Sequence, residues 1–256
     1  MTPKNKNIGF SLVEMAIVLF IVALLLGGLL PTLSSQIDLQ KSKETQKILV
    51  EAQDALLGFA IANGRLPCPA FGINMGLESF ASSPPATTAG NANNGICLDF
   101  FDGFLPAATL GLAPVDAQGF MVDGWGNRIH YAVANNTVSD VSKTFTRTDG
   151  MKMATMGKIA EKELLYVCAS ATGITNSDCG SAAKLTDKAV AIIYSLGKNG
   201  ITTGATGDEA ANPNPNKPHS DEVFVSHEQT PTFDDIVVWL SPNILFNRMV
   251  AAGKLP

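Results

Sequence analysis

The sequence has few of the residues that most catalytic sites require. It contains three histidines and four cysteines in 256 residues, and only 16% of its side chains are charged. No two cysteines form a C-x-x-C pair, which argues against a zinc site of that type. A G-x-x-x-x-G-K-[ST] phosphate loop is absent, and no Ser-His-Asp triad or catalytic carboxylate pair can be argued from spacing. We therefore predict that the chain is not an enzyme.

Basic residues are also scarce. There are 18 lysines and arginines against 23 aspartates and glutamates, which gives a formal net charge of -5. No basic stripe appears beyond residue 50, so we expect no nucleic-acid partner. The isolated lysines Lys152 and Lys158 are predicted to be solvated surface side chains.

One long apolar run stands out against this composition. From Phe10 to Leu30 the only charged residue is Glu14, and a helix of that length spans about 31 Å, enough to cross a bilayer. A cleaved secretory signal would have a shorter apolar core. A plain anchor would not need an acid, which costs about 2.5–3.5 kcal/mol at the centre of a membrane helix. Lys4 and Lys6 precede the run and favour a cytoplasmic N-terminus.

A partner for the acid would explain why it is tolerated. If the chain were cut after Gly9, Phe10 would carry a new ammonium group at the start of the apolar segment. That ammonium and the Glu14 carboxylate of a neighbouring copy could neutralise each other in the membrane. The cost of one buried charge would then favour assembly.

The segment Gly9-Phe10-Ser11-Leu12-Val13-Glu14-Met15 resembles the processing site of type IV prepilins and type II secretion pseudopilins. The resemblance implies that a prepilin peptidase cuts between Gly9 and Phe10 and methylates Phe10. It implies that Glu14 guides methylation and subunit docking, and that Pro31 bends the helix. The implied partners are the prepilin peptidase, other pilin or pseudopilin subunits, the membrane, and an inner-membrane assembly platform with its ATPase. The alternative is an anchor that contains a stray acid.

The rest of the chain predicts an α+β fold. Beyond Pro31 the pattern becomes amphipathic, and Asn63-Gly64 is a helix-ending signal. Short apolar or alternating segments predict strands at 128–133, 164–168, 189–194 and 235–240. A last helix is predicted from Pro242 to Ala252, with Ser241 as its cap. We expect a long N-terminal helix, transmembrane and then amphipathic, packed on a head with a small antiparallel sheet.

This pattern also predicts the domain organisation of the chain and its location in the cell. The predicted parts are a cytoplasmic leader peptide at 1–9, a membrane and assembly helix at 10–31, an amphipathic helix at 32–64 and a periplasmic head at 65–256. Segments 72–96 and 204–222 are rich in small and polar residues and are predicted to be surface loops. The precursor would cross the bacterial inner membrane once and join a periplasmic or extracellular filament after assembly.

The four cysteines would all lie in an oxidising compartment under this topology. Three pairings are possible. We favour the sequence-local scheme, Cys68 with Cys97 and Cys168 with Cys179, because each bond would close a weakly structured loop. Loop entropy gives about 3–4 kcal/mol for each. The alternative is four buried free thiols.

Three further segments are similar to motifs of the major pseudopilin of type II secretion. They are Asp123–Tyr131, Ser195–Gly200 and Asp234–Trp239. The resemblance implies a calcium site in the loop that joins the second motif to the third. Oxygen ligands from that loop would suit calcium. The candidate ligands are Asn199, Asp208, Asp221 and Asp234, with Glu209 and Glu222 as further acids. The alternative is that these are solvated loop acids.

Together these observations predict a structural filament subunit, a minor pilin or a pseudopilin, of a type IV pilus or a type II secretion filament. The size of the head and its long loops favour a minor or specialised subunit. The alternative function is a membrane-anchored extracytoplasmic binding protein. Its loops 72–96 and 204–222 would then recognise a ligand such as DNA or a surface glycan.

Overall fold

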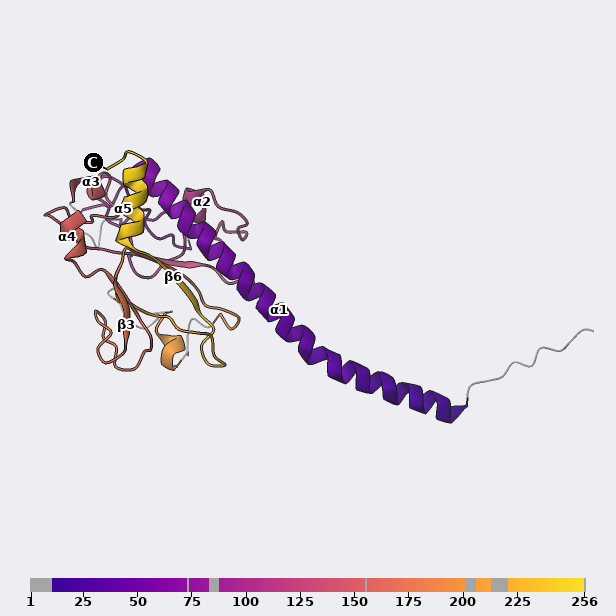
Figure 1. The fold of residues 1–256 in the computed structure, drawn as a ribbon. Helices are drawn as coiled ribbons and strands as arrows, with labels where there is room; N and C mark the ends of the chain where they lie inside the picture. Colours follow the sequence, from indigo (N-terminus) through magenta and orange to yellow (C-terminus); the bar gives the residue numbers. More distant parts are fainter. Residues whose placement is uncertain are drawn as a thin grey trace, which may run out of the picture. The chain divides into compact units, whose positions relative to one another are not determined.

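The computed structural model has a mixed α+β architecture (Figure 1). It describes residues 11–72, 74–82, 88–154, 156–200, 206–212 and 221–255, and for 26–34 it describes the backbone only. The chain divides into two compact units, Met1–Lys41 and Ser42–Pro256. Each unit is described by itself.

The first unit is dominated by helix α1, which runs from Leu12 to Asn63 and continues into the second unit. Pro31 lies inside this helix. In the part of the chain that the structure describes, no helix is both long enough and apolar enough to cross a membrane. The leader at 1–9, Phe10 and the side chains of residues 26–31 in the predicted span lie outside the described residues.

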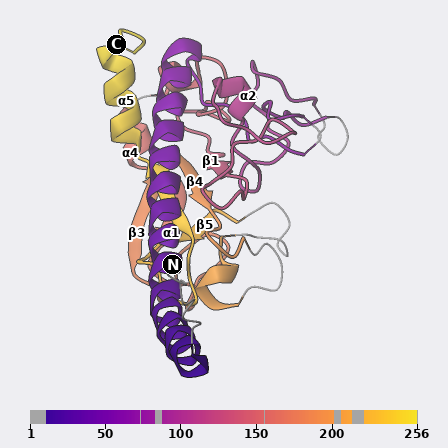
Figure 2. The same ribbon diagram turned by 90° about the vertical axis from the view of Figure 1, so that its right-hand side faces the viewer.

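In the second unit, α1 buries one face against the head. Leu49, Ala52, Leu56 and Ala60 follow the spacing of one helical stripe, and each is fully buried. The helix ends where the sequence predicts, because Gly64 adopts a left-handed φ of 70° and its N–H donates to the carbonyl of Ala60. The C-terminal helix α5 (Pro242–Ala251) lies beside this part of α1 (Figure 2).

Two three-stranded sheets form the head, where the sequence predicts one. The first has the antiparallel order β1-β4-β6. Its strands are β1 (His130–Val133), β4 (Ala191–Ser195) and β6 (Ile236–Leu240). The central strand β4 is buried along its whole length, which explains its continuous apolar sequence. In register, Ala191 lies opposite Val133 on one side and Leu240 on the other.

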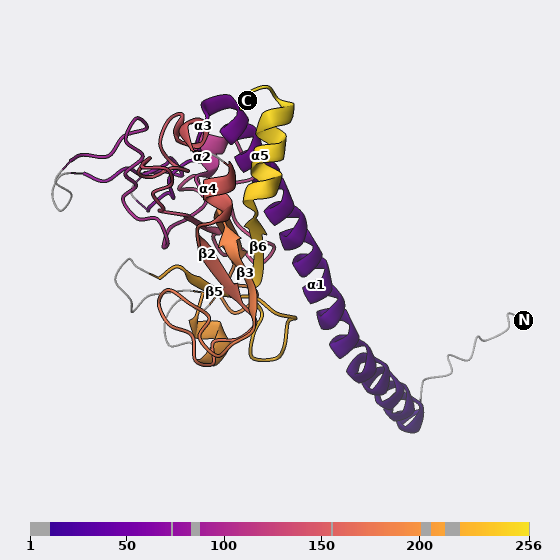
Figure 3. The same cartoon turned by 60° about the vertical axis from the view of Figure 1, so that its left-hand side comes forward.

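The second sheet has the order β3-β2-β5 (Figure 3). Its strands are β2 (Leu165–Cys168), β3 (Lys184–Ala189) and β5 (Val223–Val225). Strands β2 and β5 are parallel, so the head is not purely antiparallel as predicted. The sequence pattern does not predict β3, whose Lys and Asp side chains are exposed or half-buried, or β5, which is only three residues long. The predicted strand 189–194 divides at Val190, which joins β3 to β4.

The remaining helices are short. They are α2 (Ala107–Leu110), α3 (Gly150–Met153), α4 (Met156–Ala160) and the 3₁₀ helix η1 (Gly207–Ala210). Helix α5 has the predicted cap, because the Ser241 hydroxyl accepts a hydrogen bond from the Ile244 N–H at 3.4 Å. Pro242 occupies its first turn.

Both disulfides follow the sequence-local scheme. Cys68 bonds to Cys97, and Cys168 bonds to Cys179. The first one ties down the predicted loop 72–96. The described residues of that loop contain turns and isolated bridges, including Phe80 with Cys97, but no regular helix or strand. In the predicted loop 204–222, the described segment 206–212 contains η1.

The head contains a buried histidine, His130. His130 is 8% exposed; its ring stacks on Tyr194 and is tilted by 53° against Phe104, with ring centroids 4.9 Å apart in each pair. Its Nδ1 atom has no hydrogen-bond partner. Burial lowers the pKa of His130 to about 4. Between about pH 6.5 and pH 4 this histidine is therefore protonated in the unfolded chain but still neutral in the folded chain. The free energy of unfolding therefore falls as pH falls through that window.

We expect His130→Phe, which keeps the aromatic stack, to reduce this acid sensitivity. Between pH 7 and pH 4.5 the variant should lose about 2–3 kcal/mol less stability than the unchanged chain. Denaturant unfolding of both proteins at the two pH values measures this difference, and comparing the pair cancels the other titrating groups. An equal loss in both proteins would show that His130 does not control the acid response.

Candidate functional site

At the start of α1, Glu14 is bound to its own helix. The Ser11 N–H donates to the Glu14 carboxylate at 2.9 Å, and the Glu14 N–H donates to the Ser11 hydroxyl at 3.2 Å. This reciprocal pair is a capping box, and it satisfies two N–H groups that the first helical turn leaves without partners. The S-x-x-E spacing in the sequence could have predicted it. Gly9 and Phe10 lie outside the described residues.

In the head, the first two pseudopilin-like segments meet around Asp123, which is 5% exposed. One carboxylate oxygen accepts from the N–H groups of Trp125 at 2.8 Å and Asn127 at 2.9 Å. The other accepts from the Ser195 hydroxyl at 2.6 Å. The Asn127 side chain donates to the carbonyl of Gly197 at 2.7 Å. The carboxylate therefore fixes the Gly-rich turn against the end of β4.

The third pseudopilin-like segment, Asp234–Trp239, contacts the same turn. Gly197 has a φ of 64°, and a Cβ atom there would lie 2.3 Å from the carbonyl oxygen of Asp234. The Asn199 N–H donates to the Asp234 carboxylate at 2.9 Å. Only glycine allows the chain at 197 to approach Asp234 this closely. The segments that are far apart in the sequence thus form one structural unit.

A group of three acids, Glu209, Asp234 and Asp235, lies at these segments and is called the acid cluster below. One carboxylate oxygen from each lies within 4.8 Å of the others. The Asn199 side chain donates to Glu209 at 2.6 Å, and the Asp234 N–H donates to the other Glu209 oxygen at 3.3 Å. Helix η1 brings Glu209 to the start of β6, where Asp234 and Asp235 lie.

The acid cluster has buried carboxylate oxygens that lack hydrogen-bond partners. Asp235 is 3% exposed, and its Oδ2 accepts from the Asn212 side chain at 2.7 Å. Asp235 Oδ1 and Asp234 Oδ1 are buried, and neither has a hydrogen-bond partner. Burial raises the pKa of Asp235 to about 8; the Asn212 hydrogen bond lowers it, and the charges of Glu209 and Asp234 raise it. Burial without partners favours either the protonated form of a carboxylate or the binding of a cation.

The donor set fits a hard cation. Carboxylate oxygens are the ligands that calcium prefers, and calcium tolerates irregular geometry. Such an ion could be held by Glu209, Asp234 and Asp235. It would also bind the two carboxylate oxygens that have no hydrogen-bond partner. Asp235 was not among the predicted ligands, because in the sequence it reads as the first residue of a buried strand.

Two of the predicted ligands have other partners. Asp208 accepts from the Ala171 N–H at 2.6 Å and contacts His227 Nε2 at 3.1 Å. Asp221 accepts from the Val223 N–H at 3.0 Å, at the start of β5. Neither belongs to the acid cluster. Asn199 and Asp234 do lie together, as the resemblance implies.

The Asp208 contact also positions a histidine. His227 Nδ1 lies 2.8 Å from the Glu228 carbonyl oxygen, while Nε2 lies 3.1 Å from the Asp208 carboxylate. These two contacts join the segment after β5 to η1.

Comparison with known proteins gives one match. Residues 4–30 match the family model described as the prokaryotic N-terminal methylation motif. Neither the curated proteins nor the solved structures include a significant match to the chain. The motif implies a membrane-anchored precursor that a prepilin peptidase processes and that assembles with other pilins, and it suggests a structural protein. Residues 4–30 therefore carry the class III signal of type IV pilins and pseudopilins, which indicates a type IV pilin-like precursor.

Proposed function

We propose that the chain is a structural subunit, a minor pilin or a pseudopilin, of a type IV pilus or a type II secretion filament. The methylation motif over residues 4–30 carries this proposal. The exposed apolar side chains of the first unit support it, because Leu12, Phe20 and Leu24 are 91%, 65% and 62% exposed. Large apolar side chains in such a row are stabilised by burial in lipid or against other subunits.

The capping box gives a physical route to assembly. Cleavage after Gly9 would create an ammonium group on Phe10. The next residue is Ser11, whose N–H donates a hydrogen bond to the Glu14 carboxylate. The cap would hold the Glu14 carboxylate at the helix start, where an ammonium from a neighbouring subunit could reach it. Each charge would lower the cost of burying the other.

The head supports a specialised subunit outside the cytoplasm. Its two disulfides fit an oxidising compartment such as the periplasm. The long predicted loops 72–96 and 204–222 favour a minor pilin or pseudopilin. In this proposal the inner-membrane platform and its ATPase supply the energy to extract the helix from the membrane.

Processing tests the proposal directly. We expect co-expression with a prepilin peptidase to shorten the chain by residues 1–9 and to add one methyl group to Phe10. Intact mass spectrometry measures both changes. Gly9→Leu is the control, and it should leave the chain uncut. If the chain without the Gly9→Leu substitution keeps its full mass in the presence of the peptidase, the proposal is overturned and the anchored binding protein is favoured.

We also propose that the acid cluster binds calcium and stabilises the head. Calcium should raise the melting temperature of the full chain at pH 7.5, and a hundredfold excess over its dissociation constant corresponds to about 2.7 kcal/mol. Asp235→Asn should abolish this increase, because it removes a carboxylate ligand. Asp208→Asn should retain it, because Asp208 is outside the cluster.

The measurement is thermal unfolding of each variant with calcium, with magnesium and with a chelator. A response to calcium that survives in Asp235→Asn and disappears in Asp208→Asn would show that the ligand set is different. An equal response to magnesium and calcium in every variant would indicate general charge screening instead of a site.

A further inference from the structure

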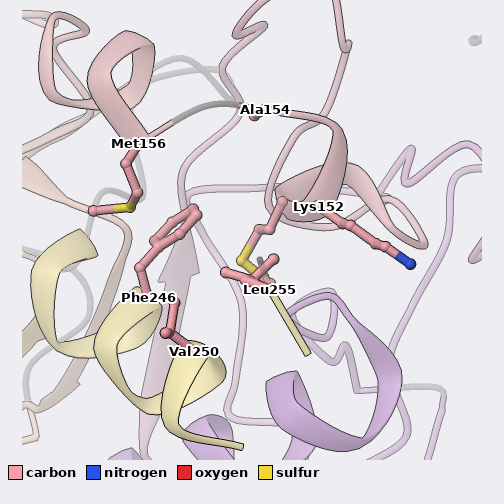
Figure 4. A pocket seen from close by; sticks show the side chains of 7 residues that line it. Lys152, Ala154, Met156, Phe246, Val250 and Leu255 are labelled. Atoms are coloured by element: carbon pink, nitrogen blue, oxygen red, sulfur yellow. The ribbon is translucent and has the colours of Figure 1, made fainter. Parts of the chain in front are cut away.

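We propose that a cavity beside α5 binds the acyl chain of an amphipathic carboxylate, and that Lys152 and Lys254 bind its head group. The cavity has a volume of about 280 Å³ and lies among α3, α4 and α5 (Figure 4). Its apolar walls are formed by Met151, Met156, Phe246, Val250 and Leu255.

The walls of this cavity are apolar and adaptable. Three of the eight methionines of the chain lie between residues 151 and 156. Met156 is 38% exposed and Val250 is 47% exposed, so apolar surface at the mouth remains in contact with water. Methionine is flexible and polarisable and fits ligands of irregular shape. An acyl chain in the cavity would remove this surface from water.

Positive charge lies beside the apolar cavity. Lys152 also lines an adjoining hollow of about 270 Å³, together with Lys254 and Asp149. Two lysines and one aspartate thus line this hollow. Within the described residues, neither lysine forms an ion pair. Figure 4 shows the Lys152 side chain extending away from Met156 and Phe246, with its nitrogen outside the apolar cavity.

These two features select the class of ligand. The apolar cavity is too small for a two-chain lipid and suits a single chain of medium length. The adjoining hollow, called the rim below, has two lysines and one aspartate, and this excess of positive charge favours an anionic head group over a neutral one. A fatty acid has both properties. Lys152 therefore has a binding role in this proposal, where the sequence predicts only a solvated side chain.

The test uses the full chain in lipid nanodiscs with ¹³C-labelled methionine methyl groups. Hexanoate, octanoate and decanoate are titrated, with the free concentration measured by dialysis. We expect the NMR signals of Met151 and Met156 to shift, while those of Met75 and Met121 stay unchanged. Affinity should rise about fourfold with each added methylene until the cavity is full. Equal shifts at all four methionines would overturn the proposal.

Matched variants test the cavity and the rim separately. Val250→Phe should fill the cavity and abolish the shifts, whereas Ile244→Phe, which is equally exposed on α5 but does not line the cavity, should not. Changing both Lys152 and Lys254 to Gln should weaken decanoate binding about tenfold and leave decanol binding unchanged. Lys158→Gln is the control. Unchanged binding in Val250→Phe, or an unchanged decanoate affinity in the double lysine variant, would overturn the proposal.

Discussion

Glu14→Gln is expected to leave cleavage after Gly9 intact and to reduce incorporation into filaments about a hundredfold. The side-chain oxygen of glutamine can still accept from the Ser11 N–H, so the helix start keeps its cap. The negative charge is lost, and the ammonium of a neighbouring subunit would then be buried alone. An unpaired charge in a membrane helix costs about 2.5–3.5 kcal/mol, which corresponds to this factor.

Comparison with Glu14→Ala separates the two roles of this residue. Alanine removes the cap as well as the charge, so it should also weaken the helix start. The amounts of processed protein in sheared filaments and in membranes, measured by quantitative immunoblotting, give the incorporation ratio. Glu51→Gln, an exposed change on α1, is the control and should assemble normally. If Glu14→Gln assembles as well as the unchanged protein, the carboxylate serves only as a cap.

Arg65→Met is expected to lower the free energy of unfolding by about 3–5 kcal/mol. Arg65 and Glu78 form a bidentate pair with two contacts of 2.7 Å, and their side chains are 7% and 15% exposed. The guanidinium also lies over the rings of Phe59 and Phe80. Removing it leaves the Glu78 carboxylate buried without its cation, and that uncompensated charge is the source of the loss.

Two further variants test this explanation. Adding Glu78→Leu to Arg65→Met should recover much of the stability, because no charge then remains buried. Lys158→Met breaks the exposed pair with Glu161, whose partners are 60% and 64% exposed, and should cost less than about 1 kcal/mol. Denaturant unfolding of the full chain measures all three. Similar losses for Arg65→Met and Lys158→Met would contradict the role assigned to burial.

The sequence predicts the elements whose signals are local. The end of α1 depends on Gly64, and the start of α5 depends on Ser241 and Pro242. The processing signal is likewise contained in one short segment, because the match to the methylation motif involves residues 4–30 and no residue of the head. In each case neighbours along the chain supply the partners, so no knowledge of the fold is needed.

Asn212 shows the opposite case. In the sequence it belongs to a polar segment that predicts a solvated loop, yet in the structure it is 1% exposed. Its side chain pairs with both the N–H and the carbonyl of Val225, as a neighbouring strand would, and it donates to Asp235. The Tyr194 hydroxyl donates to its carbonyl at 2.9 Å. These partners come from β4, β5 and the start of β6.

The sequence by itself determined the long helix and its C-terminal end, the processing signal and the apolar strands, because hydrophobic periodicity and capping act between near neighbours. Only the tertiary structure decided that Asp235 joins Glu209 and Asp234, that Asp208 contacts His227 instead, and that β5 lies parallel to β2. Those arrangements depend on which distant segments share a buried space. Burial then changes what each polar side chain can bind.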